Sequence, residues 1–226
     1  MTIAEAVPAA GRERSIDEAG LILAGISERV GAAAQPLCAT YLGRNCRFHV
    51  SLDPSATPRA EMSGQGQVTV TLGMVSQLGS EDEIAAVVAH EFGHHLAGHI
   101  DRRRLRGLAA GTAAGTLLGA VVPFGGIAGW ALSQGAAQLG SSATQLVFSK
   151  DEEREADYLG AYLVARAGYD LDRAGLVWVR LTRGGPSETA GWLDSHPAGP
   201  ERLAAWRRTS DEVRASPDLM PRRSGQ

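Results

Sequence analysis

Apolar side chains recur at helical spacing in two long segments of the chain. In residues 15–42 they return every three or four positions, which predicts an amphipathic helix. Residues 80–104 show the same period, and Ser80 followed by Glu83 predicts a capping box at the start of this second helix. We expect each helix to face a core with one apolar stripe. The inward residues would be Ala19, Leu23, Ile26 and Val30 in the first helix, and Ile84, Val87, Val88 and Phe92 in the second.

Two short segments between these helices have the pattern of β-strands. Residues 46–52 and 67–72 are rich in apolar, aromatic and β-branched residues, and residues 53–66 contain the prolines and glycines of a loop. The sequence after Ser80 has a helical pattern. The predicted fold class is therefore α+β, mostly α, with a small β-sheet.

Composition and charge indicate one compact domain. The chain has 226 residues, 44% of them hydrophobic, and a net charge of −3, so it is long enough to bury a single core. The near balance of charges argues against a nucleic-acid partner, whose binding needs a basic surface. Residues 1–14 and 210–226 are polar and contain prolines, so we expect flexible tails around a domain that spans residues 15–209.

The segment His90-Glu91-Phe92-Gly93-His94 has the chemistry of a zinc site. Residues four apart lie on the same face of an α-helix, so both imidazoles can bind one ion. Glu91 lies on the edge of that face, where its carboxylate can reach a water molecule at the metal and act as general base. The alternative is an exposed helix on which two histidines occur by chance.

A catalytic zinc ion needs a third protein ligand. The metzincin pattern would require glycine at position 97 and histidine at position 100, but the chain has Ala97 and Ile100 there. We therefore interpret His95 and His99 as surface histidines or as residues behind the ligands.

The acidic segment 151–157 offers the third ligand. Glu153 and Asp157 are four apart, so a second helix would present both carboxylates on one face. A zinc ion with its histidines would offset the repulsion between them, with Glu153 on the metal and Asp157 accepting the far N–H of a ligand histidine. The alternative is a solvated, acidic start of a helix.

H-E-x-x-H followed by E-x-x-x-D is the gluzincin pattern, and the local sequence resembles one family in particular. The stretch Glu-Arg-Glu-Ala-Asp-Tyr-Leu-Gly at 153–160 is similar to the HtpX-type and CAAX-prenyl-protease-type zinc metallopeptidases, metallopeptidase family 48, in their soluble BepA-like branch. Further segments match as well: strand 67–72 leading into Gly73-Met74, Ala167-Gly168-Tyr169-Asp170, and Ser195-His196-Pro197. The resemblance covers about residues 15–207.

The resemblance implies a zincin-like metalloprotease domain with one Zn²⁺ per chain. It implies a general base, Glu91, and three zinc ligands, His90, His94 and Glu153. Asp157 becomes the partner behind a ligand histidine. His196 would lie near the metal, as a catalytic donor to the reacting carbonyl or as a reversible extra ligand; a histidine that stabilises the turn before Pro197 is the alternative. Arg202 would support the same pocket.

The resemblance also implies a function. It points to a zinc-dependent endopeptidase that hydrolyses polypeptide substrates in protein quality control. An extended substrate would lie along the edge of the small sheet, with strand 67–72 as the candidate edge. The alternative is a latent or chaperone-like zinc protein whose site is closed by His196.

The segment 107–149 contains no charged residue and is interpreted as a helical hairpin. Glycines recur in it every four residues from Gly107 to Gly119, which allows close helix packing. Residues 107–122 are too few for a spanning helix, which needs about 20 residues. We expect a lid beside the active site; the alternative is contact with a membrane or a partner protein through 107–149.

The expected location is the bacterial periplasm or a membrane surface, because relatives in this family are often periplasmic or membrane-bound. The N-terminus has no pattern of a signal peptide, so the cytoplasm is the alternative. Cys38 and Cys46 are close enough in sequence for a disulfide, which would need an oxidising compartment. Two buried free thiols are the other possibility for this pair.

Overall fold

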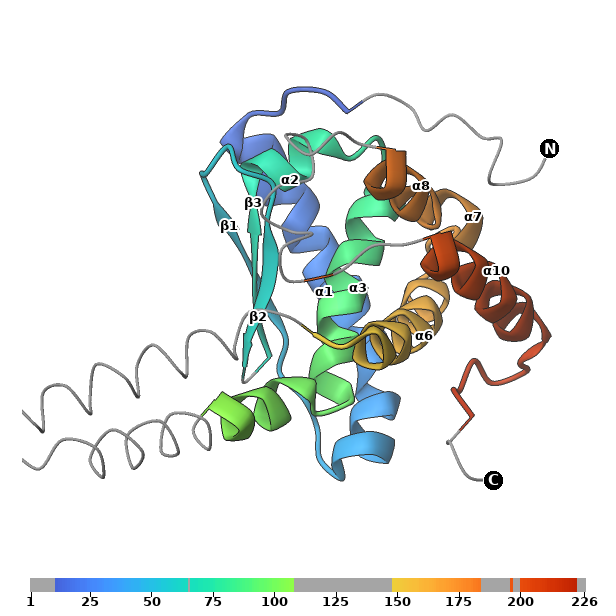
Figure 1. Ribbon diagram of the computed structural model, residues 1–226. Helices are drawn as coiled ribbons and strands as arrows, with labels where there is room; N and C mark the ends of the chain where they lie inside the picture. Colours follow the sequence, from blue (N-terminus) through green and yellow to red (C-terminus); the bar gives the residue numbers. More distant parts are fainter. Residues whose placement is uncertain (1–10, 65, 108–147, 184–195, 197–199, 223–226) are drawn as a thin grey trace, which may run out of the picture. The chain divides into compact units, whose positions relative to one another are not determined.

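The computed structural model describes residues 11–64, 66–107, 148–183, 196 and 200–222 of the chain. The chain divides into two compact units, one formed by residues 1–97 with 148–226 and the other by residues 98–147. The helices and strands discussed below belong to the first unit (Figure 1). In the second unit, residues 99–107 are helical. The predicted hairpin at 107–149 lies, apart from its ends, outside the described residues.

Helix α1 spans Ile16–Leu42 and confirms the first predicted helix. Ser15 caps it, because its side chain accepts a hydrogen bond from the backbone N–H of Glu18. The helix continues through Pro36 and is followed by Gly43, which has the left-handed conformation with a φ of 65°. Its predicted inward residues are all buried: Ala19, Leu23, Ile26 and Val30.

Three strands form the sheet: β1 (His49–Asp53), β2 (Ala60–Gly64) and β3 (Gln67–Thr71). Their order is β1-β3-β2, and β3 pairs in parallel with β1 and antiparallel with β2. Two predictions are wrong here. Residues 53–66 are not only a loop, because they contain β2, and 67–72 is not an edge strand, because β3 has a strand on each side. Strand pairing depends on distant partners, so the local pattern could not distinguish a central strand from an edge strand.

Further helices of this unit are α2 (Leu72–Gln77), α3 (Glu81–Leu96), α6 (Lys150–Arg166), α7 (Leu171–Ala174), α8 (Leu176–Arg183) and α10 (Pro200–Ala215). Helix α10 continues past residue 209, and Ser210 and Val213 on it are buried. Beyond it, Arg166 of α6 donates to the carbonyl oxygen of Asp218 at 2.9 Å. The domain boundary expected at residue 209 therefore lies inside α10, which ends at Ala215.

Helix α3 begins as the sequence predicted. The Ser80 side chain accepts a hydrogen bond from the backbone N–H of Glu83 at 3.2 Å. The second half of the predicted capping box is wrong, because the Glu83 carboxylate accepts from Arg180 Nε at 2.9 Å instead of returning to Ser80. This largely buried ion pair ties the start of α3 to α8.

Helix α3 lies in the interior of this unit and contacts α1, α6 and the sheet (Figure 1). Its side chains are buried on all faces from Asp82 to Gly93, whereas the sequence predicted one buried stripe. The prediction of a single buried stripe was wrong because α1, α6 and the sheet cover different faces of α3. The helix ends at Leu96 rather than near residue 104, and Gly98 then has a positive φ of 70°.

A disulfide joins Cys38 of α1 to Cys46, with the two Cα atoms 5.8 Å apart. It connects the last part of α1 to the segment that enters β1. The structure therefore selects the disulfide over the two free thiols that the sequence left open.

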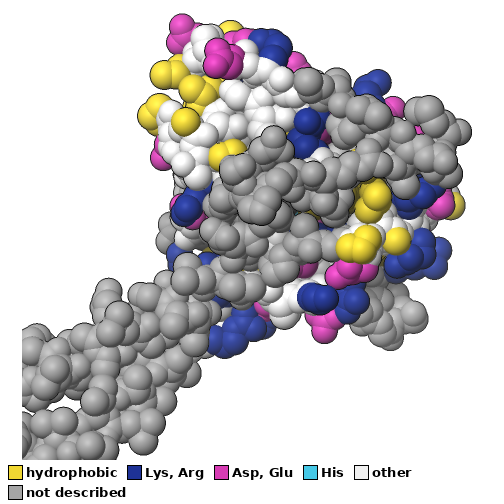
Figure 2. Space-filling view, turned by 45° about the horizontal axis from the view of Figure 1, so that its top comes forward, with side chains coloured by type: hydrophobic (Ala, Val, Ile, Leu, Met, Phe, Trp, Pro, Cys, Tyr) yellow, Lys and Arg dark blue, Asp and Glu magenta, His cyan; other side chains and the backbone are white. Residues whose placement is uncertain are grey.

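The surface carries charges of both signs. Acidic and basic side chains are interspersed on the face shown in Figure 2, in keeping with the net charge of −3. Among the helices in the described ranges, none combines the length and the apolar character that crossing a membrane requires.

Candidate metal centre

Helices α3 and α6 pack closely because two glycines lie at their contact. A Cβ atom at Gly93 would lie 2.5 Å from a backbone oxygen of α6, and one at Gly160 would lie 3.3 Å from backbone atoms of α3. Glycine permits this approach because it has no Cβ. The contact brings the H-E-x-x-H face of α3 against the acidic face of α6.

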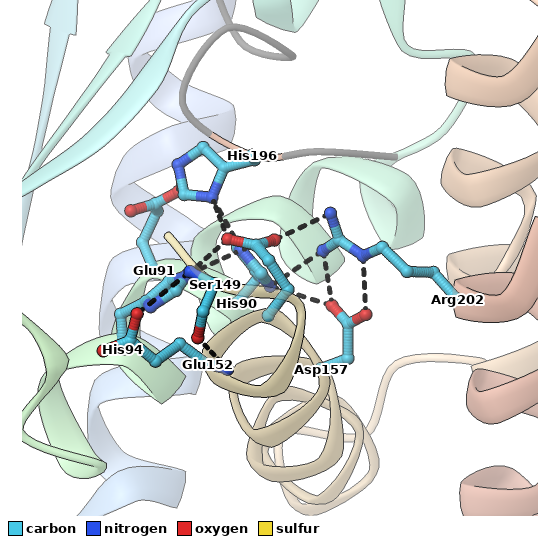
Figure 3. A network of polar contacts seen from close by, with 9 residues as sticks. His90, Glu91, His94, Ser149, Glu152, Asp157, His196 and Arg202 are labelled. Carbon is cyan, nitrogen blue, oxygen red and sulfur yellow. Dashed lines mark hydrogen bonds and ion pairs between the residues drawn. The ribbon is translucent and has the colours of Figure 1, made fainter. Parts of the chain in front are cut away.

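Four buried side chains offer metal-binding atoms within 4.8 Å of one another: His90, His94, Glu153 and His196. His90 Nε2 lies 3.0 Å from His94 Nε2 and 3.1 Å from His196 Nδ1. Glu153 Oε1 lies 3.3 Å from His94 Nε2 and 3.0 Å from His196 Nδ1. The structure thus brings together the three predicted ligands from α3 and α6 with His196, which was expected near the metal and precedes α10. Figure 3 labels the three histidines.

The hydrogen bonds behind the cluster fit a metal ion. Asp157 Oδ1 lies 2.9 Å from His90 Nδ1, and because a carboxylate can only accept, this Nδ1 carries the ring proton. The lone pair of His90 Nε2 then points into the cluster, as a metal ligand requires. Two imidazoles and one carboxylate are a ligand set of catalytic zinc sites.

The electrostatics favour the metal-binding forms of both ligand types. Burial lowers the pKa of the His94 ring well below its ordinary value; Glu153 acts in the opposite direction but is outweighed, and the rings of His90 and His196 lower this pKa further. Burial raises the pKa of Glu153, but its interactions with His90, His196 and His94 outweigh burial, and this pKa falls below its ordinary value. Neutral imidazole and ionised carboxylate are the forms that bind a metal.

Glu91 is buried beside the cluster and is not one of its four donors. Its Oε1 atom lies 3.4 Å from His196 Nε2, so it faces the ring nitrogen of His196 that is turned away from Glu153 (Figure 3). This is the position expected of a carboxylate that acts beside a metal without binding it.

Of the carboxylates in the first two turns of α6, one caps the helix and two face the ligand cluster. Glu152 forms a capping box with Ser149: Ser149 Oγ accepts from the Glu152 backbone N–H at 3.2 Å, and Glu152 Oε2 accepts from the Ser149 backbone N–H at 3.0 Å. Glu153 and Asp157 are buried and face the cluster instead. The capping box was not predicted, although the Ser-x-x-Glu pattern was present at 149–152.

Arg202 of α10 was only loosely assigned to this pocket from the sequence. Its Nε and Nη2 atoms donate to the two oxygens of Asp157 at 2.8 and 2.7 Å, and its Nη1 lies 2.7 Å from Glu153 Oε2. Burial lowers the pKa of the guanidinium, but the carboxylates of Asp157, Glu153 and Glu91 raise it overall.

Aromatic rings complete the surroundings. The central carbon of Arg202 lies 4.1 Å from the centre of the Trp178 ring, and Phe148 stacks on His94 with 3.9 Å between ring centroids. Neither ring was predicted, because an aromatic residue in a helical apolar pattern is typical of a core. His95 lies outside the cluster and packs edge-on against Phe48, with 5.6 Å between ring centroids, in agreement with its predicted place away from the ligands.

We expect Gly93→Ala to destabilise the protein and to weaken metal binding. The added Cβ would collide with backbone rather than with a movable side chain, so α3 and α6 must separate, and overpacking of this kind costs about 1–3 kcal/mol. The free energy of unfolding in urea and the zinc affinity measure both effects. Gly25→Ala on α1 is the matched control, because nothing lies within 4 Å of its Cβ position, and it is expected to gain about 0.5–1 kcal/mol. Equal unfolding free energies for the wild type and Gly93→Ala would contradict the close contact.

Residues 50–210 match the model of peptidase family M48. The chain is 30% identical over 137 residues to the mitochondrial metalloendopeptidase OMA1 of Arabidopsis thaliana, a match that covers 61% of the chain and 26% of the relative. It is 32% identical over 158 residues to OMA1 of Schizosaccharomyces pombe, covering 69% of the chain and 44% of the relative. It is 29% identical over 163 residues to the metalloprotease LoiP of Escherichia coli, covering 70% and 59%.

These matches cover between 26% and 59% of the length of the three relatives. They agree with the motifs of the sequence, and they confirm the resemblance that those motifs indicated. The family match extends from β1 to α10 and includes both metal-site helices. The chain therefore belongs to peptidase family M48.

Proposed function

We propose that the protein is a zinc-dependent endopeptidase that hydrolyses peptide bonds of polypeptide substrates in protein quality control. The observation that carries this proposal is the buried cluster of donor atoms from His90, His94 and Glu153, with Glu91 beside it. Membership of peptidase family M48 supports it, as do relatives named metalloendopeptidase and metalloprotease.

Zinc is the metal that this ligand set supports best. Catalytic zinc sites use three protein ligands and keep a fourth position open. We assign His90, His94 and Glu153 as the ligands of one zinc ion per chain, with Asp157 behind His90. A zinc ion held there would supply Lewis acidity toward the scissile carbonyl and make water nucleophilic near neutral pH.

Glu91 moves the proton in this proposal. Its carboxylate accepts a proton from the attacking water and later gives it to the amine nitrogen as the C–N bond breaks. Glu91 is buried, with its Oε1 atom 3.4 Å from His196 Nε2. A purely structural metal site needs no such base, so the presence of Glu91 favours an enzyme.

An extended substrate is proposed to pair with β2 rather than with the strand at 67–72. That strand is β3 in the centre of the sheet, whereas β2, within the described residues, has β3 on one side only. β2 also contacts α3, which carries two of the proposed ligands. Pairing with an edge strand uses main-chain hydrogen bonds, which suits an enzyme that acts on unfolded polypeptides.

A second candidate function is a latent or chaperone-like zinc protein whose site is closed by His196. The observation that favours it is the position of His196 Nδ1, which lies 3.1 Å from His90 Nε2 and 3.0 Å from Glu153 Oε1. A ring nitrogen among the ligand atoms would fill the position that a catalytic site keeps open. We propose that the described position of His196 is this closed state of the enzyme.

Metal content and hydrolysis of unfolded casein, measured on the wild type and His196→Ala, test both candidates. A peptidase is expected to hold one zinc ion per chain and to lose activity with a chelator and regain it with zinc. We expect His196→Ala to keep zinc and to hydrolyse casein faster, because the closing ring is gone. Slower hydrolysis would assign His196 to the reacting carbonyl instead, and absence of zinc from both proteins would refute the peptidase proposal.

We propose that the protein works in an oxidising compartment such as the bacterial periplasm, in association with a membrane. The disulfide between Cys38 and Cys46 supports this, because such bonds persist outside reducing compartments. In the cytoplasm, which is the alternative, the pair would be kept reduced. Contact with a membrane or a partner through residues 107–149 stays a prediction.

A further inference from the structure

Two buried carboxylates, those of Glu153 and Asp157, lie one turn apart on α6 and share a contact with one guanidinium. Glu153 and Asp157 have side-chain exposures of 1% and 2%, and like charges at this spacing repel each other. One guanidinium, that of Arg202 on α10, contacts both and is itself only 3% exposed. Figure 3 shows Arg202 beside Asp157, on the side of that carboxylate that is turned away from His196.

The contact with Glu153 determines which of its oxygens faces the ligand cluster. Arg202 Nη1 lies 2.7 Å from Glu153 Oε2, whereas Glu153 Oε1 lies 3.3 Å from His94 Nε2 and 3.0 Å from His196 Nδ1. An ion pair at one oxygen of a carboxylate restricts the directions in which the other oxygen can point. Arg202 therefore orients Glu153 so that Oε1 is directed at the proposed metal position.

Through its contact with Asp157, Arg202 also orients the ligand His90. Arg202 bonds both oxygens of Asp157, which fixes the plane of that carboxylate. Asp157 Oδ1 also accepts from His90 Nδ1 at 2.9 Å, so the carboxylate plane sets the direction of the His90 ring. The Trp178 ring, 4.1 Å from the guanidinium carbon, covers one face of the Arg202 guanidinium group.

We propose that Arg202 is a positioning residue that pre-forms the metal centre by orienting Glu153 directly and His90 through Asp157. The inference rests on the proposed function, because it takes His90, His94 and Glu153 as the metal ligands. Arg202 acts from behind both ligands and does not touch substrate or metal.

For Arg202→Gln, a purely electrostatic role and a positioning role of Arg202 predict opposite changes in zinc affinity. Removing the positive charge beside the cluster in Arg202→Gln would, by electrostatics alone, make zinc bind more tightly. If the Arg202 guanidinium positions the ligands, the same substitution weakens zinc binding, because Glu153 and Asp157 lose the group that contacts both. Arg202→Lys keeps the charge but has no planar fork that can hold both carboxylates, so positioning predicts a loss there too.

The zinc dissociation constant, measured by competition with a chromophoric chelator, decides between these alternatives. We expect it to rise about 10–100-fold in both Arg202→Gln and Arg202→Lys, the usual cost of removing a partner behind a ligand. Thermal unfolding of the metal-free proteins is recorded in parallel, so that a general loss of stability is seen separately.

Arg180→Lys is the matched control. Arg180 makes a comparable fork on Glu83, at 2.9 and 3.3 Å, and Glu83 is not among the four donors. We expect Arg180→Lys to lower the unfolding temperature and to leave the zinc dissociation constant unchanged.

Three outcomes would overturn the inference: unchanged or tighter zinc binding in Arg202→Gln, wild-type affinity in Arg202→Lys, or an equal loss of affinity in Arg180→Lys. If Arg202→Gln does not fold, the affinity of Arg202→Lys decides alone. A wild type that binds no zinc would refute the proposed function itself, whereas a zinc-binding wild type with unaffected variants would refute only the role of Arg202.

Discussion

Glu91→Gln is expected to lower kcat/KM for peptide hydrolysis by about 10²- to 10⁴-fold while zinc remains bound, the range that a general base contributes. The amide has almost the shape of the carboxylate but cannot accept the proton of the attacking water. Glu91 is buried, with 1% of its surface exposed. Because Glu91 is not among the four donor atoms of the cluster, the metal content should not change.

The measurement is kcat/KM on a quenched fluorescent peptide, together with zinc content, for Glu91→Gln and for Glu155→Gln. Glu155 lies on α6 close in sequence to the proposed ligand Glu153, but it is exposed, so the same chemical change there should leave kcat/KM near the wild-type value. Wild-type activity in a zinc-loaded Glu91→Gln protein would mean that another group accepts the proton.

His94→Ala is expected to remove the bound zinc and, with it, the hydrolytic activity. One imidazole and one carboxylate would remain of the three proposed ligands, and the loss of affinity should exceed the roughly 10–100-fold that removal of a partner behind a ligand costs. The variant should also lose the stabilisation that zinc gives to the folded state, so its unfolding temperature would no longer rise when zinc is added.

The adjacent residue provides the control for this substitution. His95→Ala removes the same side chain one position later on α3, where the ring packs against Phe48 outside the cluster. We expect it to keep zinc and to retain the rise of the unfolding temperature with zinc. If His94→Ala still binds one zinc ion per chain at wild-type affinity, His94 is not a ligand and the proposed ligand set is wrong.

His196 links the proposed metal position to the proposed base. Glu91 and His196 lie 3.4 Å apart between Oε1 and Nε2, so a ring that closes the site also lies against the proposed base. Removal of the ring would then expose both the open metal position and Glu91. Faster hydrolysis by His196→Ala, abolished again by Glu91→Gln in the same chain, is the pattern expected of one enzyme with a reversible latch.

Local patterns accounted for much of the fold and for the proposed ligands. Helix α1, the start of α3 and the strands β1 and β3 agree with the predicted elements within a few residues. These features depend on neighbours a few positions away, such as the Ser80 side chain that accepts from the N–H of Glu83. His90 and His94 could be paired from their spacing because one helical turn brings them to the same face.

Long-range contacts account for the predictions that failed. The Glu83 carboxylate was expected at its own N-cap but bonds Arg180, 97 positions later in the chain. β3 was expected at an edge, but β2 forms within a segment rich in proline and glycine and takes that place. In the first case the partner is distant in sequence, and in the second the partner strand has no local pattern that would predict it.

The sequence by itself indicated the residues of the proposed metal site, namely the H-E-x-x-H helix and the two carboxylates one turn apart, and it indicated the family of the chain. Only the tertiary structure decided how those groups are held, because their partners come from other helices. Arg202 reaches Asp157 and Glu153 across 45 and 49 positions of the chain, and Gly93 matters because the backbone of α6 lies against it. Spacing along one helix follows from its constant rise and turn, whereas contacts between helices depend on the packing of the whole core.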